Sequence, residues 1–195
     1  MIDSVSYALP NAREAFAVGR WPFAERGEPF AMVTLHRPSN VDEPESLREL
    51  MGALETVGRE VPVVFPVHPR TRARLDALGW EVSPGSQLRL VEPIGYLEML
   101  GLVEQAALVI TDSGGLQEET SFLGVPCLTV RPNTERPITI SHGTNRLVAP
   151  NRAALETAAK EALAAGGRRQ VQIERWDGKT AERIAAVLID GQVFR

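Results

Sequence analysis

The turn from Asp112 to Gly115 directly follows an apolar, β-prone run and precedes a stretch with helical spacing. The first backbone N–H groups of a helix have no partner within the helix, and the helix dipole places partial positive charge there. Glycine lets a ligand approach the backbone closely, and the hydroxyl of Ser113 can add a hydrogen bond. The turn therefore favours a phosphate ligand, although Ser and Gly are equally common as plain helix caps.

Histidines and arginines follow several of the other apolar runs. Because ligands of open parallel sheets bind beyond the carboxyl ends of the strands, we expect these cationic groups to gather around one anion. A lone histidine is more often structural than catalytic. His36 has the stronger case, because an imidazole beside an arginine at a phosphate can hold or donate a proton. The residues concerned are His36, Arg37, His68, Arg70, Arg131 and Arg136.

Two carboxylates, Glu118 and Glu119, lie about one turn after the glycines. A carboxylate in this place can accept hydrogen bonds from both hydroxyl groups of a ribose, as acidic residues do in dinucleotide sites. The alternative is a solvated helix face whose negative charge is favourable near the helix start. The residues alone leave both interpretations open.

Several other site chemistries find no support. The phosphate-binding motifs GxxxxGKS/T and GxGxxG are absent from the sequence. A serine nucleophile at Ser113 would need a glycine where Thr111 stands. The single cysteine, Cys127, excludes an intramolecular disulfide or a cysteine-based zinc site and is expected to be buried and inert, and the three scattered histidines form no metal motif. We expect no metal and no cofactor.

Short apolar runs alternate with stretches of helical spacing, which predicts parallel strands joined by helical crossovers, an α/β Rossmann-like fold with a three-layer arrangement. The expected strands are residues 30–35, 63–67, 88–91, 108–111, 127–130 and 146–148. The expected helices are residues 11–18, 43–59, 70–78, 96–105, 115–123, 152–165 and 178–189.

Side-chain chemistry predicts where some helices begin and end. Asp42 and Glu45 have the spacing of a capping box, and Asn151 and Asp177 are candidate N-caps for the last two helices. Gly79 stands where a helix needs a left-handed residue to end.

The overall composition narrows the class of protein. The chain has 195 residues with 21 Lys and Arg against 25 Asp and Glu, a length that fits a single globular domain. The net charge of −4 argues against sequence-independent binding to nucleic acid or to an anionic membrane. No apolar run approaches the roughly 18 residues of a membrane span, and the first residues lack the pattern of a secretory signal, so we expect a cytoplasmic protein.

Several sequence blocks together resemble the carboxyl-terminal half of UDP-N-acetylglucosamine 2-epimerases, over about residues 28–151. The blocks are VTLHRPSNVDEPESL, VFPVHPRTR, LVEPIGYLEML, LVITDSGGLQEETSFLGVPCLTVRPNTERP and GTNRLV. The resemblance implies one half of a glycosyltransferase-B-like fold, in which two Rossmann-like domains face a cleft. It assigns residues 1–27 to a helical segment at the domain junction and residues 28–195 to the UDP-binding domain.

The resemblance also implies roles for individual residues. His36 is implied to be catalytic near the departing nucleotide. The resemblance implies that UDP is bound through the diphosphate, the ribose and the uracil, by Ser113, Gly114 and Gly115 at the diphosphate, Arg37 and Arg136 at the phosphates, Glu119 at the ribose and the backbone around Met99 at the uracil. Many family members have a glutamate where this chain has Ile138.

The implied activity is interconversion of UDP-N-acetylglucosamine and UDP-N-acetylmannosamine, with UDP and UDP-N-acetylhexosamine as ligands. The family's amino-terminal domain, which handles the proton at carbon 2 of the sugar, has no counterpart in this sequence. We therefore expect the chain alone to be inactive and to form a homodimer or to need an amino-terminal domain or subunit. A glycosyltransferase and a non-catalytic nucleotide-binding remnant or split subunit remain as alternatives.

Overall fold

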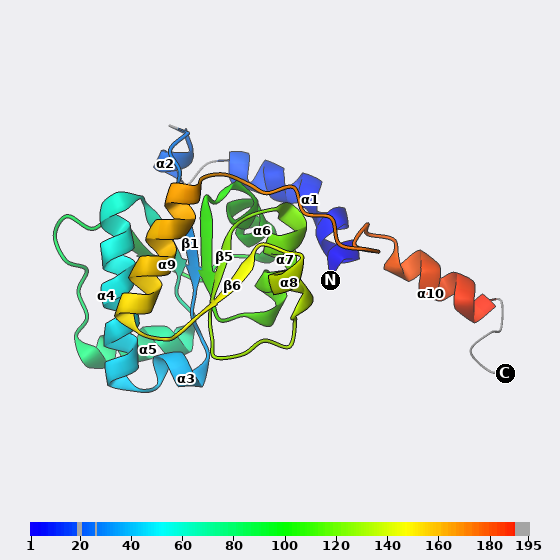
Figure 1. The fold of residues 1–195 in the computed structure, drawn as a ribbon. Coiled ribbons are helices and arrows are strands. Elements are labelled where there is room, and N and C mark those ends of the chain that lie inside the picture. The colour runs from blue at the N-terminus through cyan, green and yellow to red at the C-terminus, as the bar shows by residue number, and fades with distance from the viewer. Residues whose placement is uncertain (19–20, 26, 190–195) are drawn as a thin grey trace.

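The computed structural model describes residues 1–18, 21–25 and 27–189 (Figure 1). Its centre is a parallel sheet of six strands in the order β3-β2-β1-β4-β5-β6. The predicted α/β Rossmann-like class is confirmed. The strands are β1 Ala31–Thr34, β2 Val63–Pro66, β3 Leu88–Val91, β4 Leu108–Thr111, β5 Cys127–Val130 and β6 Asn145–Val148.

Helices cover both faces of the sheet, and the four inner strands β1, β2, β4 and β5 bury side chains on both sides. Ala31 and Val33 of β1 contribute to a core with α4 and α9, whereas Met32 contributes to a second core with α6 and α7. The helices are α1 Ile2–Ala17, α2 Pro22–Glu25, α3 Pro38–Val41, α4 Pro44–Glu60, α5 Pro69–Leu78, α6 Tyr96–Gln105, α7 Gly114–Leu123, α8 Ile138–Ser141, α9 Arg152–Ala165 and α10 Thr180–Ile189.

The strand order reverses direction between β1 and β4, which lie side by side at the centre of the sheet. From β1 the chain builds outward to β2 and β3, then returns to β4 and continues outward to β5 and β6. At this reversal the connections from β1 and from β4 run in opposite directions, so neither connection closes over the carboxyl ends of these two strands. A ligand crevice is expected there. The sequence residues singled out above follow β1 and β4.

The expected boundaries of the helices are partly confirmed. Gly79 ends α5 with φ of 59°, and the Asn151 side chain accepts a hydrogen bond from the N–H of Ala154 at 2.9 Å. The capping box was wrong, because the carboxylate of Asp42 pairs with Arg70 and Arg74 instead of capping α4. Helix α4 begins at Pro44 instead. Proline has no backbone N–H, so this position leaves no donor that needs a cap.

The two ends of the described chain differ from expectation. Helix α1 begins at Ile2, nine residues earlier than the predicted 11, because Val5, Ala8 and Ala12 pack with Leu100 of α6. Asp177 accepts a hydrogen bond from the N–H of Lys179, before α10 begins.

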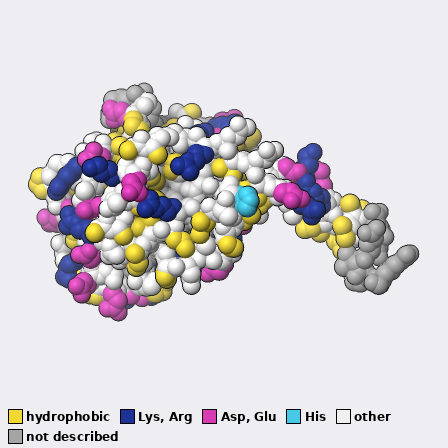
Figure 2. All heavy atoms as spheres, viewed as in Figure 1, with side chains coloured by type: hydrophobic (Ala, Val, Ile, Leu, Met, Phe, Trp, Pro, Cys, Tyr) yellow, Lys and Arg dark blue, Asp and Glu magenta, His cyan; other side chains and the backbone are white. Residues whose placement is uncertain are grey.

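Helix α10 is held to the rest of the protein at its start, where Asp3 of α1 accepts a hydrogen bond from the N–H of Ala181 at 2.8 Å. From there α10 extends away from the body of the molecule (Figure 1). None of its described residues is buried, and hydrophobic side chains are visible along it in Figure 2. Among the described residues, the apolar face of this helix therefore has no partner.

Candidate functional site

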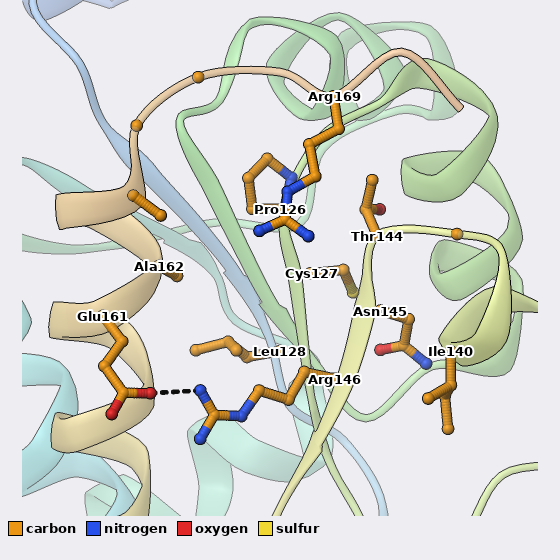
Figure 3. Close-up of a pocket in the computed structure, with 14 residues that line it drawn as sticks. Pro126, Cys127, Leu128, Ile140, Thr144, Asn145, Arg146, Glu161, Ala162 and Arg169 are labelled. Carbon is orange, nitrogen blue, oxygen red and sulfur yellow. Dashed lines mark hydrogen bonds and ion pairs between the residues drawn. The ribbon is translucent and has the colours of Figure 1, made fainter.

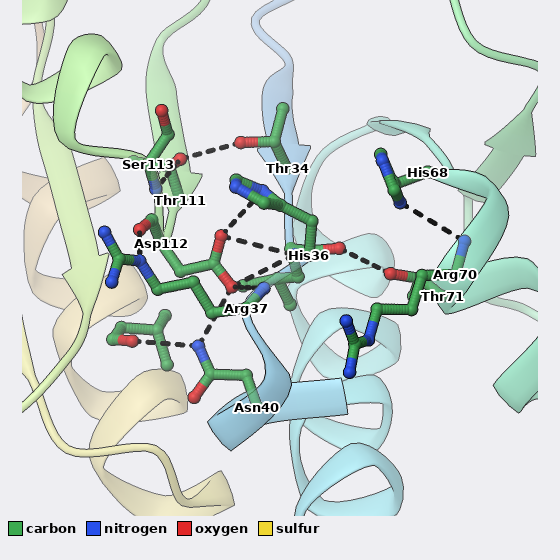
Figure 4. Close-up of polar contacts among 12 residues, drawn as sticks. Thr34, His36, Arg37, Asn40, His68, Arg70, Thr71, Thr111, Asp112 and Ser113 are labelled. Atoms are coloured by element: carbon green, nitrogen blue, oxygen red, sulfur yellow. Dashed lines mark hydrogen bonds and ion pairs between the residues drawn. The ribbon is translucent and has the colours of Figure 1, made fainter. Parts of the chain in front are cut away.

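The ends of β1 and β4 are tied together at the edge of the sheet. The hydroxyls of Thr34 and Thr111, which are register partners, lie 2.7 Å apart. The next residues along each strand are Leu35 and His36 on one side and Asp112 and Ser113 on the other. Figure 4 shows the side chains of this region converging on the carboxylate of Asp112.

Asp112 is completely buried, and its carboxylate accepts hydrogen bonds from four donor groups. Its Oδ2 accepts from the backbone N–H of His36 at 3.0 Å, from the backbone N–H of Arg37 at 2.9 Å and from Nδ2 of Asn40 at 3.1 Å. Its Oδ1 lies 3.0 Å from Nδ1 of His36. Since every one of these partners is a donor, the carboxylate is ionised and its charge is satisfied.

The electrostatics agree with this geometry. Burial by itself raises the pKa of a carboxyl group, but the hydrogen bonds from His36, Arg37 and Asn40 outweigh it and hold the pKa of Asp112 below its ordinary value. The hydrogen bond to Asp112 raises the pKa of His36, against the opposing effects of burial and of Arg37. His36 is therefore poised to carry a proton at the mouth of the site.

A cavity of about 270 Å³ opens beside this pair. It has polar groups on one side and an apolar wall formed by Pro93, Ile94 and Met99 on the other. A planar base needs an apolar wall of this kind, and phosphate needs the polar side. The remaining lining residues are Thr34, Leu35, His36, Pro66, His68, Ser113 and Leu116.

The start of α7 forms the next wall. Ser113 is its N-cap residue but makes no side-chain capping hydrogen bond, so the plain capping interpretation of this serine is not supported. A Cβ atom added to Gly114 would meet no heavy atom within 4 Å, whereas one added to Gly115 would lie 3.2 Å from Cε of Met1. The backbone at Gly114 thus faces open space, as close approach of an anion requires.

Glu119 points into the structure from the second turn of α7 and is only 6% exposed. Burial raises the pKa of its carboxyl group to about 6, an effect opposed in part by a hydrogen bond from the Tyr96 hydroxyl at 3.4 Å. Burial also raises the pKa of Tyr96, to about 12, so the phenol remains a donor. The solvated-face interpretation is wrong for Glu119.

The loop after β5 brings Arg136 to the same region. Its Nε lies 3.1 Å from Oε2 of Glu118, which joins the loop to α7. Thr134 fixes this loop to α7, because its hydroxyl donates a hydrogen bond to the side chain of Gln117 and accepts one from the backbone N–H of Arg136 at 2.9 Å. Arg136 is 39% exposed at its side chain and can still turn toward a ligand.

Three other residues that were expected to surround the anion bind to other groups of the protein. Arg70 pairs with Asp42, and Arg131 is buried against Glu135 with its guanidinium 2.7 Å from the carboxylate, so neither offers a free charge to an anion. His68 caps α5, because its Nδ1 accepts from the N–H of Arg70 at 3.2 Å. The arginines that remain at the site are therefore Arg37 and Arg136.

Arg37 lies at the site with its side chain fixed. Its Nε donates to the backbone oxygen of Asp112 at 2.8 Å, which leaves the other end of the guanidinium available beside the start of α7. Of the predicted residues, His36, Met99 and Ser113 line the cavity. Arg37 is bound to Asp112 beside it, Gly114, Gly115 and Glu119 follow Ser113 on α7, and Arg136 is joined to the same helix through Glu118.

Two residues of the site were missed from the sequence, Asp112 in its role as partner of His36 and Tyr96 as partner of Glu119. Asp112 directly precedes the Ser-Gly-Gly turn, so its position was visible, but the sequence gives no sign that it faces the turn after β1. That proximity arises only from the pairing of β1 with β4.

A second cavity, of about 300 Å³, lies at the other end of the sheet, between α9 and the strands β5 and β6 (Figure 3). Arg146 there pairs with Glu161, while Cys127 is buried and burial raises the pKa of its thiol to about 11. The thiol is therefore unreactive, as predicted, and the cavity holds no group suited to catalysis. Within the described residues there is no cluster of three potential metal ligands and no helix long and apolar enough to cross a membrane.

Comparison with known proteins identifies relatives that share this fold and these motifs. The family model for UDP-N-acetylglucosamine 2-epimerase matches residues 1–189. The UDP-N-acetylglucosamine 2-epimerase of Methanocaldococcus jannaschii is 38% identical over 167 residues, which make up 84% of this chain and 45% of that protein. The UDP-2,3-diacetamido-2,3-dideoxy-D-glucuronate 2-epimerase of Pseudomonas aeruginosa is 40% identical over 135 residues, or 69% of this chain and 37% of that protein.

A solved structure supports the same relationship. The crystal structure of the Methanocaldococcus jannaschii UDP-GlcNAc 2-epimerase in complex with UDP-GlcNAc and UDP superposes with a TM-score of 0.82 at 34% identity. The match covers 96% of this chain and 52% of that one. The chain therefore spans about half the length of the relatives that it matches.

Proposed function

The chain belongs to the UDP-N-acetylglucosamine 2-epimerase family, and from this premise we propose that it is the UDP-sugar-binding domain of such an enzyme. In the full enzyme it would act in the interconversion of UDP-N-acetylglucosamine and UDP-N-acetylmannosamine. The observation that carries the proposal is the convergence of His36, the start of α7 and the buried Glu119 on one edge of the sheet.

The geometry supports one arrangement of UDP. The diphosphate would lie at the start of α7, where the hydroxyl of Ser113 and the backbone N–H groups of Gly114 and Gly115 would donate to its oxygens, while the N–H of Ser113 itself donates to Thr111. Arg37 and Arg136 would add charge-assisted hydrogen bonds to the phosphates.

The rest of the nucleotide would extend toward α6. Glu119 would accept hydrogen bonds from the ribose hydroxyls, which favours its ionised form. The uracil would lie against the apolar wall near Met99.

The proposed reaction removes the proton at carbon 2 of the sugar and breaks the bond between carbon 1 and the phosphate oxygen, whose electron pair leaves with UDP. A glycal remains. UDP then adds back at carbon 1 while a proton is returned to the opposite face of carbon 2, which inverts the configuration there. His36 would donate a proton to the departing phosphate, while the α7 start and Arg136 stabilise the negative charge that develops there. The base at carbon 2 would come from outside this chain.

The missing wall of the cleft defines the proposed partner. We assign residues 1–27 to a helical segment at the domain junction and residues 28–195 to the UDP-binding domain, with the counterpart supplied as an amino-terminal domain, a separate subunit or a second copy. The open apolar face of α10 supports such a partner, since Ile184 and Leu188 are 56% and 53% exposed. The proposal includes a cytoplasmic location.

The test is nucleotide-dependent stabilisation of the chain. A ligand that binds only the native state raises stability by about 2.7 kcal/mol at a hundredfold excess over Kd. We expect UDP to raise the melting temperature more than UMP does, because UMP lacks the second phosphate for the start of α7. Equal shifts for the two nucleotides would exclude diphosphate recognition at Gly114 and Gly115.

A non-catalytic nucleotide-binding domain is the alternative, because the residues described around the cavity are suited to binding the nucleotide whether or not a sugar reacts there. It has the same pocket and the same nucleotide preference. It differs in having no partner that restores turnover, so a mixture with the relatives' amino-terminal half separates it from the leading proposal.

A further inference from the structure

The side chain of His36 is held at one nitrogen and open at the other. Its Nδ1 lies 3.0 Å from Oδ1 of Asp112, and the side chain is 42% exposed, while Asp112 has no exposed surface. Nδ1 must carry the hydrogen of this contact, because an ionised carboxylate accepts hydrogen bonds and donates none. Nε2, on the opposite side of the ring, is then left on the side of the cavity that His36 lines.

We propose that Asp112 is a positioning residue for His36, which fixes the imidazole through Nδ1–H and presents Nε2 to the ligand cavity. The use of Nε2 to donate a proton to a departing phosphate rests on the proposed function, whereas the orientation itself does not. In such an arrangement a carboxylate that binds one ring nitrogen fixes the tautomer and the orientation of the histidine, so the other nitrogen can act on a ligand.

The surroundings of Asp112 make its orientation rigid. The backbone N–H groups of His36 and Arg37 both donate to Oδ2, so the carboxylate is bound to the same turn that carries the imidazole. Asn40 bridges Oδ2 and the backbone oxygen of Val130 at 3.1 and 3.0 Å, which fixes the carboxylate from the β5 side. A rotation that released His36 would break several of these bonds at once.

A carboxylate is needed here and an amide is not equivalent. All the neighbours of the Asp112 side chain are donors, and an asparagine would direct its own NH₂ group at some of them. The described charged and titratable groups around His36 are Asp112, Arg37 and His68, whose ring centroid lies 6.0 Å from that of His36. Of these, only Asp112 favours the protonated imidazole, so loss of its charge must lower the proton affinity of His36.

The competing explanation is that Asp112 only ties β4 to the turn after β1 and that its contact with His36 is incidental. The neutral tautomer of His36 separates the two. A positioned His36 keeps hydrogen on Nδ1 after it loses its charge. His68 gives an internal reference of the opposite kind, because its Nδ1 accepts the hydrogen bond from Arg70 and its hydrogen must be on Nε2.

The experiment is an NMR titration of the ¹⁵N-labelled 195-residue chain without ligand. Its three histidines give separable ring signals, which His36→Gln and His68→Gln variants assign. We expect neutral His36 to be the Nδ1–H tautomer, neutral His68 to be the Nε2–H tautomer, and the pKa of His36 to lie above the ordinary histidine value of about 6.5. A His36 that is Nε2–H, or whose pKa is not raised, would overturn the proposal.

The variant Asp112→Asn tests the cause. We expect the titration midpoint of His36 to fall below its value in the wild-type chain and the tautomer preference to be lost, while the matched charge removal Asp42→Asn leaves both unchanged. An unchanged His36 in Asp112→Asn contradicts the proposal. If that variant does not fold, the tautomer in the wild-type chain decides the question alone.

Addition of UDP to the same samples tests the proposed function separately. Absence of any change in the His36 ring signals at saturating UDP argues against the proposed function, yet leaves the assignment of Asp112 as it stands. If UDP changes the His36 ring signals but His36 is the Nε2–H tautomer, the proposed function is supported and the assignment of Asp112 is overturned.

Discussion

At the scale of single residues, Glu119 shows a cost to stability within the site, because its charged form is less stable in the folded protein than in the unfolded chain. Burial raises the pKa of its carboxyl group from 4.5 to about 6, and among the described residues its hydrogen-bond donor is the Tyr96 hydroxyl, at the long distance of 3.4 Å. In the ligand-free protein the ionised carboxylate is therefore poorly satisfied. A ribose would supply the missing donors, so the same feature that weakens the fold strengthens ligand binding.

The first prediction concerns the stability of Glu119→Gln. Because the folded-state pKa is raised, the folded protein binds more protons than the unfolded chain between pH 4.5 and 6, and this residue's contribution to stability falls as the pH rises through that window. We expect Glu119→Gln to be more stable than wild type by about 2 kcal/mol at pH 7.5 and nearly equal at pH 4. Urea denaturation at both pH values measures the difference, and an equal difference at both would contradict the burial argument.

The second prediction concerns Arg136. Removal of a charged hydrogen-bond partner costs about 1.5 to 3 kcal/mol, so Arg136→Ala should weaken UDP binding by roughly 10- to 150-fold in titration calorimetry. Arg146→Ala is the matched control, since Arg146 pairs with Glu161 beside the second cavity. The same Kd for both variants would remove Arg136 from the site.

Helices and strands position these residues through close backbone packing, most tightly where α1 crosses α6. A Cβ atom added to Gly101 would lie 2.5 Å from the backbone oxygen of Ala12 and 2.9 Å from Cβ of Phe16. Neither atom can move without shifting α1. In contrast, a Cβ atom added to Gly52 of α4 would meet only the flexible guanidinium of Arg152, at 3.1 Å.

The third prediction compares alanine at these two helical glycines. Alanine favours a helix by about 1 kcal/mol over glycine, which should leave Gly52→Ala unchanged or slightly more stable. Gly101→Ala should be less stable by about 1 to 3 kcal/mol, because overpacking outweighs the helix preference. Urea midpoints measure both, and a stabilised Gly101→Ala would show that α1 does not pack against α6 as described.

Under the proposed function the chain as a whole forms one wall of a cleft, and this leads to the fourth prediction. A general acid or base typically contributes a rate factor of 10² to 10⁴, and the base for carbon 2 is absent from this chain under the proposed mechanism. We expect the pure 195-residue chain to bind UDP without incorporating solvent deuterium at carbon 2 of UDP-N-acetylglucosamine, as measured by mass spectrometry. Robust incorporation would show that residues of this chain, His36 first among them, supply the acid and the base.

The fifth prediction concerns the exposed face of α10. Ile184 and Leu188 are one turn apart on that helix, and an apolar face of this kind favours association. We expect the isolated chain to self-associate in sedimentation experiments and the double variant Ile184→Glu, Leu188→Glu to be mainly monomeric. Ile140→Glu, at an exposed residue of α8, should not alter the association, and a wild-type chain that is monomeric at all concentrations would contradict the prediction.

Most elements of this fold could be predicted from the sequence, because they depend on local chemistry. Apolar runs of three to six residues between helical stretches predicted all six strands, and helix α6 begins and ends at the expected residues, Tyr96 and Gln105. The four-residue helices α2, α3 and α8 were not predicted. The sequence also located the polar turns that follow β1 and β4. Such turns depend on hydrophobic patterns and on glycine, which are properties of neighbouring residues.

Which of those polar residues face one another depends on tertiary contacts that the sequence pattern does not show. Strand pairing brings Asp112 to His36 across 76 residues of chain, and Arg70 pairs with Asp42 across 28 residues. The pair of Arg131 and Glu135 is local, because the two residues are four apart. The length of α1 depends on its contact with α6 rather than on its own spacing. A sequence pattern reports the neighbours along the chain, whereas the partner of a charged group and the pKa that results depend on residues far along the chain that the sheet brings together.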